Sequence, residues 1–202
     1  MTRIKESSIC CLPSPRATLD PTDVVAYFER MAIHPILTAP DPRLKEVSRE
    51  VERVDVEIRM LIDDMFDSMY AAKGIGLAAI QIGVPKRVIV MDLAQNADET
   101  EPYVFINPKI LWTSEDLTVA EEGCLSAPDI WDNVERPARI RAEHLDREGH
   151  PVTLEAEGLL ATCLQHEIDH LEGVLFLDHL SRLKRSIALR KLTKAKRLAA
   201  VD

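Results

Sequence analysis

The feature that most constrains this chain is the pentapeptide HEIDH at residues 166–170. It belongs to a segment, residues 157–172, in which leucine and isoleucine recur at helical spacing, and Gly173 follows as a helix stop. Two histidines at positions i and i+4 share one face of a helix, so both imidazoles can reach one metal ion. The intervening glutamate can then hold a water molecule and take its proton. The motif predicts a metal site on a helix; two unrelated histidines are the simpler alternative.

A catalytic metal site needs a third protein ligand and an open position. The candidate residues are Cys124, His144, His150, Cys163, Asp169 and His179. Cys163 lies one turn before His166 and is more simply explained as a small buried wall residue. Cys124 lies in the sequence EGCLS, where Gly123 allows the backbone to come close to a ligand. An ordinary buried thiol is the alternative for Cys124, so spacing alone leaves the third ligand open.

A second candidate site segment is GIGLAAIQ, residues 74–81. Two glycines and two alanines surround the amide side chain of Gln81, a composition that suits a backbone approaching a substrate. Tight packing in a turn explains the same pattern equally well.

The predicted elements combine into an α+β domain. Asp55 is a suitable N-cap for a helix whose apolar residues recur every three or four positions, with Gly74 as its C-terminal glycine. Strand-like runs begin at Arg87, Tyr103 and Leu117, and residues 139–157 alternate as a hairpin does. We expect antiparallel β-sheets packed around a central helix that carries HEIDH, with a C-terminal helix.

Charge is unevenly distributed along the chain. The formal net charge is -9, which argues against sequence-specific nucleic-acid binding. Residues 181–202 carry eight bases and one acid, so this tail is +7 and the rest of the chain is -16. The apolar residues expected to dock the tail on the domain or on a partner are Leu183, Ile187, Leu192, Ala195 and Leu198. A solvated basic helix is the simpler alternative.

The remaining composition bears on location and boundaries. No apolar run approaches the roughly 20 residues that span a bilayer, so no membrane association is expected. Four cysteines without an export signal favour reduced thiols and a cytoplasmic location. Residues 1–30 are interpreted as an N-terminal extension that is disordered or not native, with translation starting at Met31. Residues 31–180 are then the catalytic domain, and residues 181–202 a basic C-terminal helix.

In their order and distances, the sequences GIGLAAIQ, EGCLS and QHEIDH closely resemble the three signature motifs of peptide deformylases. The resemblance covers nearly everything from Met31 to the tail. It implies an enzyme that removes the formyl group from the N-terminal formyl-methionine of newly made polypeptides and releases formate. It also implies that Cys124, His166 and His170 hold one divalent metal ion. The family's metal is ferrous iron, which zinc, nickel or cobalt can replace.

The resemblance further implies roles for several residues. Glu167 resembles the general acid/base, while the Gln81 side chain and the Leu125 backbone N–H resemble the donors to the formyl oxygen. The residues expected to line the methionine pocket are Ile75, Gly76, Gly123, Leu159 and Cys163. For Leu159 and Cys163, a place in the ordinary core is an equally good interpretation.

One segment of this chain departs from the family pattern. The sequence APDIWDNVERP, residues 127–137, is interpreted as a loop that flanks the substrate cleft, and its Asp129 and Trp131 are unusual there. Specificity beyond the first substrate residue is therefore open.

The basic tail resembles a ribosome anchor. A zinc peptidase of the H-E-x-x-H type and an inert peptide-binding relative are the alternative functions.

Overall fold

The computed structural model describes residues 32–94 and 102–199. The expectations about residues 1–30 and a start at Met31 lie outside these ranges. The elements are η1 (Pro42–Lys45), α2 (Val56–Ala71), β1 (Gly76–Ala78), η2 (Ala79–Ile82), β2 (Val88–Asp92), β3 (Pro102–Thr113), β4 (Leu117–Cys124), β5 (Ala127–Pro137), β6 (Arg139–Leu145), β7 (Pro151–Glu157), α3 (Gly158–Leu171), η3 (Phe176–His179) and α4 (Arg182–Ala199). No helix in the described ranges is both long enough and apolar enough to cross a membrane.

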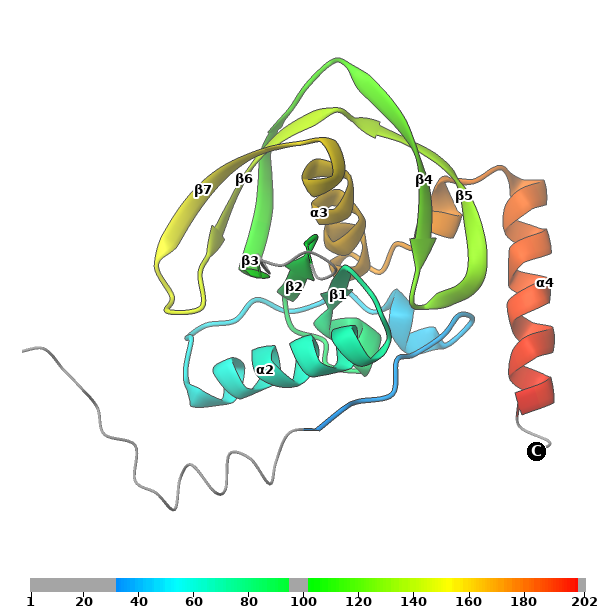
Figure 1. Cartoon of the computed structure of the whole chain (residues 1–202), viewed down its shortest axis with the longest axis horizontal. Helices are drawn as coiled ribbons and strands as arrows, with labels where there is room; N and C mark the ends of the chain where they lie inside the picture. The colour runs from blue at the N-terminus through cyan, green and yellow to red at the C-terminus, as the bar shows by residue number, and fades with distance from the viewer. Residues whose placement is uncertain (1–31, 95–101, 200–202) are drawn as a thin grey trace, which may run out of the picture. The chain divides into compact units, whose positions relative to one another are not determined.

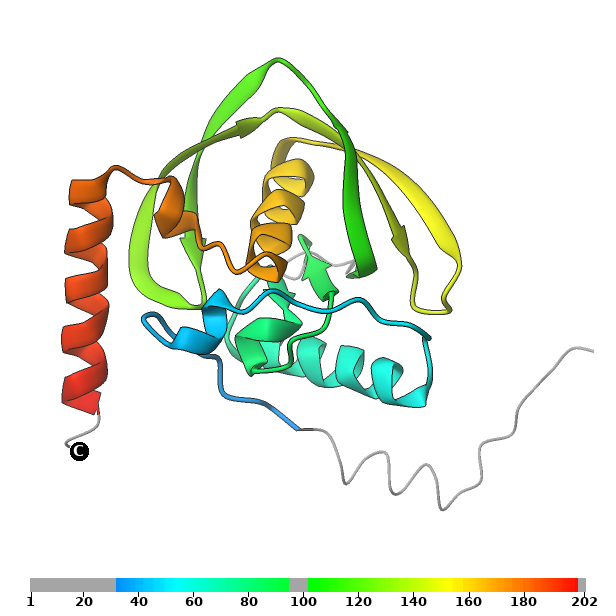
Figure 2. The same ribbon diagram turned by 180° about the vertical axis from the view of Figure 1, so that it is seen from behind.

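Two antiparallel sheets enclose helix α3 (Figures 1 and 2). One has five strands in the order β1-β2-β3-β6-β7, and the other consists of β4 and β5. Helix α3 packs against strands of both sheets, and α2 packs against β1 and β2. The predicted α+β class, the central helix with HEIDH and the C-terminal helix are confirmed.

The core forms where the periodic apolar faces meet. On α3, Leu164 and Leu171 are fully buried among residues of β1, β2, β3 and β6, while Leu160 and Ile168 pack at the edge of the same cluster. The inner face of α2 packs on β1 and β2 in a second cluster. Burial of one stripe on each helix is what the predicted three- and four-residue spacing requires.

Helix α2 begins as predicted but ends differently. The Asp55 side chain accepts a hydrogen bond from the Ile58 N–H, which confirms the N-cap. The left-handed residue after the helix is Lys73 (φ 56°), not Gly74. Gly74 is instead required for space, because a Cβ atom there would overlap the Leu125 side chain. The predicted role of Gly74 as the C-terminal glycine was wrong.

The segment predicted to be a loop after EGCLS is strand β5, which pairs with β4 over residues 131–137 and again at Ala127. Ala127 pairs with Cys124 and Trp131 pairs with Gly123, so residues 128–130 bulge out of the ladder. The loop prediction was wrong because the sequence PDIWDN has turn-like composition, whereas pairing with β4 is a long-range contact that composition does not encode.

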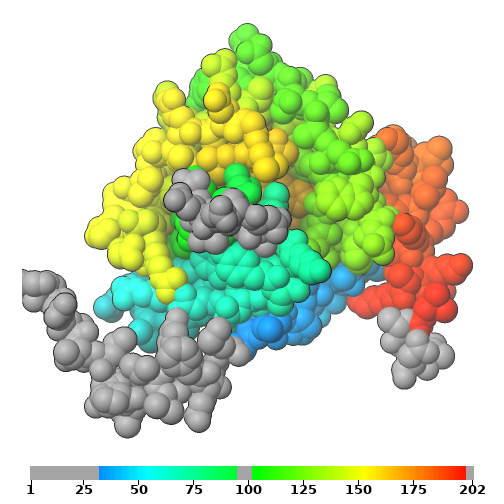
Figure 3. Space-filling model, viewed as in Figure 1, coloured from blue at the N-terminus to red at the C-terminus, as the bar shows by residue number. Residues whose placement is uncertain are grey.

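Helix α4 docks on the domain through one residue of the predicted stripe, Leu192, and through Ala188, which is not part of that stripe. Ala188 and Leu192 are buried in a cluster with residues of β5 and η3. Leu183, Ile187 and Leu198 are more than half exposed. The prediction was wrong for these three residues, whereas Leu192 docks as predicted. Figure 3 shows the surface of α4 against that of the β4–β5 sheet.

Candidate metal centre

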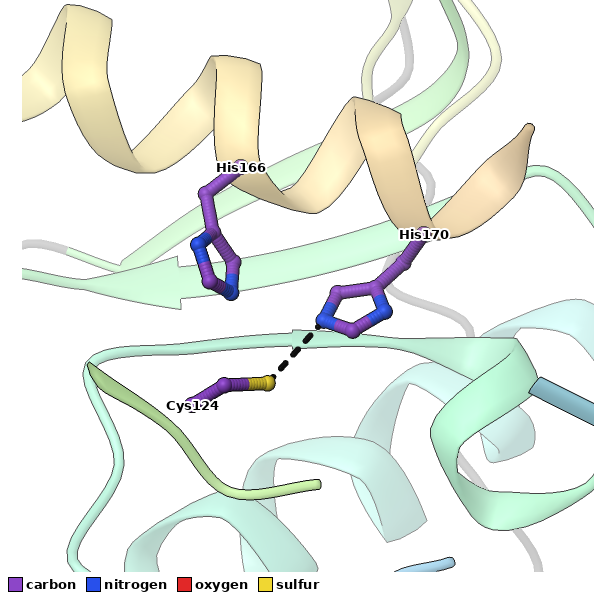
Figure 4. A group of neighbouring side chains, drawn as sticks. All are labelled: Cys124, His166 and His170. Atoms are coloured by element: carbon purple, nitrogen blue, oxygen red, sulfur yellow. Dashed lines mark hydrogen bonds between the residues drawn. The ribbon is translucent and has the colours of Figure 1, made fainter. Parts of the chain in front are cut away.

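Three side chains from two elements converge beside the central helix (Figure 4). His166 and His170 project from α3 toward Cys124 at the end of β4. Their candidate ligand atoms all lie within 4.8 Å of one another. The Cys124 Sγ atom is 3.2 Å from the His170 Nε2 atom. The two histidines are buried, so the cluster faces inward.

The other candidate third ligands lie elsewhere. Within the described ranges, these three residues form the one group of His, Cys, Asp or Glu side chains that could hold a metal ion together. The His144 ring packs on Phe105, and the His150 Nδ1 atom lies 3.3 Å from the Asp146 carboxylate in a surface turn. The His179 ring interacts with Asp169 at 2.7 Å. Of the set that spacing left open, Cys124 is the residue that the structure groups with the two histidines.

The donor set suits a divalent transition-metal ion. Burial, together with the nearby His166, lowers the pKa of His170 well below its usual value, which keeps its imidazole in the neutral form that binds metals. Its buried Nδ1 atom has no hydrogen-bond partner among the described residues, while its Nε2 atom faces Cys124. One thiolate and two imidazoles match the ligands of iron and zinc sites.

A buried network of ion pairs holds the His166 ring through its Nδ1 atom. The His166 Nδ1 atom lies 2.8 Å from Glu122 Oε2, and both oxygens of Glu122 accept hydrogen bonds from Arg136. Arg136 also donates to Asp169 at 2.8 Å. Burial of Glu122 raises its pKa, but the hydrogen bonds from His166 and Arg136 outweigh this effect and lower the pKa to about 2.

Glu122, Arg136 and Asp169 were absent from the sequence-based site. A signal for Glu122 existed, because a metal-bound histidine usually gives its second ring nitrogen a carboxylate partner. Glu122 lies two residues before Cys124. Arg136 had no such signal, since β5 was interpreted as a loop.

Glu167 is a buried carboxylate beside the cluster. It is 4% exposed, and its Oε2 atom finds no hydrogen-bond partner among the described residues. Burial raises its pKa to about 7, against a lowering effect of His166. A carboxyl group with a pKa near neutrality can both accept and donate a proton at physiological pH.

The Gln81 amide is held in one orientation. Its Oε1 atom accepts from the Ala78 N–H at 2.7 Å, and its Nε2 atom donates to Ser126 Oγ at 3.1 Å and lies 3.7 Å from Cys124 Sγ. Leu125 follows Cys124 in the turn between β4 and β5. Both residues line the same cavity as Glu167.

The predicted pocket residues line this one cavity, of about 510 Å³. They are Ile75, Gly76, Gly123, Leu159 and Cys163. Leu159 is 56% exposed, which excludes the core interpretation for it, whereas Cys163 is a buried wall residue. Trp131, which lines the same cavity, was not among the predicted pocket residues.

The sequence model of the polypeptide deformylase family matches residues 33–186. The chain belongs to this family. This chain is 62% identical over 164 residues to the peptide deformylase of Phenylobacterium zucineum. The matched region covers 81% of this chain and 97% of the Phenylobacterium protein. The chain is 59% identical over 165 residues to the peptide deformylase of Rhizobium meliloti, covering 82% and 95%.

Solved structures agree with the sequence comparisons. The peptide deformylase of Ehrlichia chaffeensis superposes with a TM-score of 0.80 at 44% identity, over 84% of this chain and 99% of that one. The Legionella pneumophila structure gives a TM-score of 0.78 at 49% identity, over 85% and 99%. This deformylase is therefore a metal-dependent hydrolase that removes the N-formyl group from nascent polypeptides. The peptidase alternative is excluded.

Proposed function

We propose that Cys124, His166 and His170 hold the divalent ion of this deformylase, and that the ion is ferrous iron. The observation that carries the proposal is the convergence of these three donors beside the buried Glu167. A thiolate with two imidazoles also accepts zinc, nickel or cobalt. When bound, such an ion lowers the pKa of water and polarises the formyl oxygen.

Glu167 is the general acid/base in this proposal. Its carboxylate accepts a proton from the attacking water and delivers it to the amine nitrogen as the C–N bond breaks, giving formate and a free N-terminus. The raised pKa of Glu167, about 7, supports both transfers.

Gln81 and Leu125 stabilise the charge that develops on the formyl oxygen. The Gln81 amide donates from its Nε2 atom, which is already oriented by the bond from Ala78 N–H to Oε1. The backbone N–H of Leu125 is the second donor. Loss of one such donor in an enzyme costs about 3 kcal/mol of transition-state stabilisation.

The methionine side chain enters the cavity lined by Ile75, Gly76, Gly123, Leu159 and Cys163. This assignment is supported by the apolar character of three of these residues and by the close approach that the two glycines allow. Glu167 lines the same cavity, so a peptide seated there has its formyl end beside the base.

An assay with formyl-Met-Ala and its unformylated twin tests the proposal. Anaerobically purified protein should release formate from the first peptide and leave the Met-Ala bond of both intact. Elemental analysis of the same sample identifies the metal. Peptide-bond cleavage, or turnover with no transition metal bound, would contradict the assignment.

The enzyme is further proposed to act in the cytoplasm, on the ribosome. Five bases of α4 line one surface groove: Arg182, Arg185, Arg190, Lys194 and Arg197. Clustered cations of this kind bind RNA phosphates through counterion release, with an affinity that falls steeply with salt. Of these bases, Arg185 also pairs with Asp178, while Lys184, outside the groove, pairs with Asp132.

Co-sedimentation with ribosomes tests this partner. Replacing Arg182, Arg190 and Arg197 by Gln should abolish low-salt co-sedimentation while the melting temperature stays at its wild-type value. Truncation of α4 is a poorer test, because it would uncover the cluster that contains Ala188 and Leu192. Equal sedimentation of wild type and variant at matched salt would leave α4 without this role.

A further inference from the structure

Part of the cavity wall lies outside the β-ladder. Ala127 and Trp131 pair with adjacent residues of β4, so residues 128–130 between them have no partner in the register. Asp129 has a left-handed backbone (φ 59°), which is uncommon for a residue other than glycine. Residues 128–131, called here the wall segment, all line the cavity. A bulge of this kind must be held by contacts other than strand pairing.

Helix α4 supplies those contacts. Lys191 donates from Nζ to the Asp129 carbonyl oxygen at 2.8 Å, and Lys184 pairs with Asp132 at 2.6 Å, so the two bonds flank Trp131. Ala188 lies one turn from both lysines. It is buried in the cluster that includes Ala127, and Ile130 packs against this cluster. Figures 1 and 2 show α4 beside β5 from both sides. One face of α4 therefore braces the wall segment.

The wall segment presents Trp131 at the cavity mouth. A Cβ atom on Gly123 would lie 2.7 Å from Cε3 and Cζ3 of the indole, so the ring lies over the Gly123 backbone, one residue before the ligand Cys124. The residue Trp131 is nevertheless 66% exposed. An exposed indole over a cavity mouth offers a large apolar surface to whatever chain leaves that cavity.

We infer that Lys191 is a positioning residue for substrate binding: it holds the wall segment so that Trp131 contacts the residues that follow the formyl-methionine. The inference rests on the proposed use of the cavity for the methionine side chain. With the methionine inside, the peptide continues past the mouth, where Trp131 is exposed. Lys191 then affects the binding of longer peptides without touching them.

Steady-state kinetics on two substrates test the inference. Lys191→Met keeps the aliphatic stem but removes the donor. The KM for formyl-Met-Ala-Leu-Ser should rise about fivefold, because a hydrogen bond from a charged group is lost. The kcat should stay unchanged, because Lys191 does not act in the chemical step. The KM for formyl-Met-Ala should rise less. Lys191→Arg, which retains donors, should restore the wild-type KM.

Three further variants sharpen the result. Trp131→Ala should raise the KM for the longer peptide, and adding Lys191→Met to it should cause no further rise, since both act through one contact. Lys109→Met, which removes an exposed lysine of β3, is the matched control and should leave both KM values at wild type.

Fluorescence gives a readout that is independent of turnover. The chain has two tryptophans, Trp112 and Trp131, so a Trp112→Phe background isolates the fluorescence of Trp131. Acrylamide should quench Trp131 more strongly after Lys191→Met. Unchanged quenching with unchanged KM would overturn the inference, as would an equal loss of kcat on both peptides with a lowered melting temperature. No formate from wild type would refute the proposed function, while quenching would still decide the role of Lys191.

Discussion

The Nδ1 atom of His166 lies 2.8 Å from the Oε2 atom of Glu122, and both groups are buried. Glu122 precedes the proposed ligand Cys124 by two residues on β4, so one strand carries a candidate ligand and the group that orients another candidate ligand. A carboxylate in this position fixes which ring nitrogen of the histidine carries the proton and leaves Nε2 for the metal.

Acid sensitivity should follow from this contact. The Glu122 pKa is about 2 in the folded protein against 4.5 ordinarily, so its contribution is present above pH 4.5 and lost as the pH falls toward 2. Glu122→Gln should cost roughly 3 kcal/mol of unfolding free energy at neutral pH. Urea unfolding at several pH values should show the difference between wild type and variant shrinking from pH 4.5 to pH 2. A difference independent of pH would contradict this account.

The ligand set makes a second prediction. Cys124→Ala, His166→Ala and His170→Ala should each purify without stoichiometric metal, because three protein ligands are the minimum for such a site. Glu167→Gln should keep the metal and lose turnover, because the carboxylate acts on protons rather than as a ligand. Elemental analysis of the four variants separates the roles. A fully loaded Cys124→Ala or a metal-free Glu167→Gln would refute the assignment.

Gly76→Ala should impair the chemical step. The added Cβ atom would lie 2.6 Å from Glu167 Oε1 and 3.0 Å from Cys163 Sγ, so the proposed base Glu167 must move. We expect kcat to fall at least about tenfold, since small displacements of catalytic groups are costly. Metal content measured on the same sample should stay at the wild-type level. A wild-type kcat would mean that Glu167 has another working position.

Leu159→Ala should weaken substrate binding and leave the fold unaffected. Leu159 is 56% exposed and lines the cavity, so removal of its side chain should change the unfolding free energy by less than about 0.5 kcal/mol. The KM for formyl-Met-Ala should rise severalfold. Leu183→Ala, at a 67% exposed position of α4, is the control and should alter neither quantity. Equal KM values for both variants would remove Leu159 from the pocket.

The local spacing of residues predicted the helices and the motif they carry. The i, i+4 histidines of α3, the Asp55 cap and the hairpin of β6 and β7 depend on contacts between residues close in the chain, and all three are present. Such features are encoded in short windows because helical and strand periodicities are local properties.

The tertiary structure decided which distant residues join the motif. Cys124 lies 46 positions before His170, and only the approach of β4 to α3 brings its sulfur within 3.2 Å of that ring. The pairing of β5 with β4 places Arg136 on Glu122, and the burial of Ala188 and Leu192 against β5 and η3 decides the face by which α4 docks. These outcomes depend on shape and burial across the whole core, which no short stretch of sequence contains.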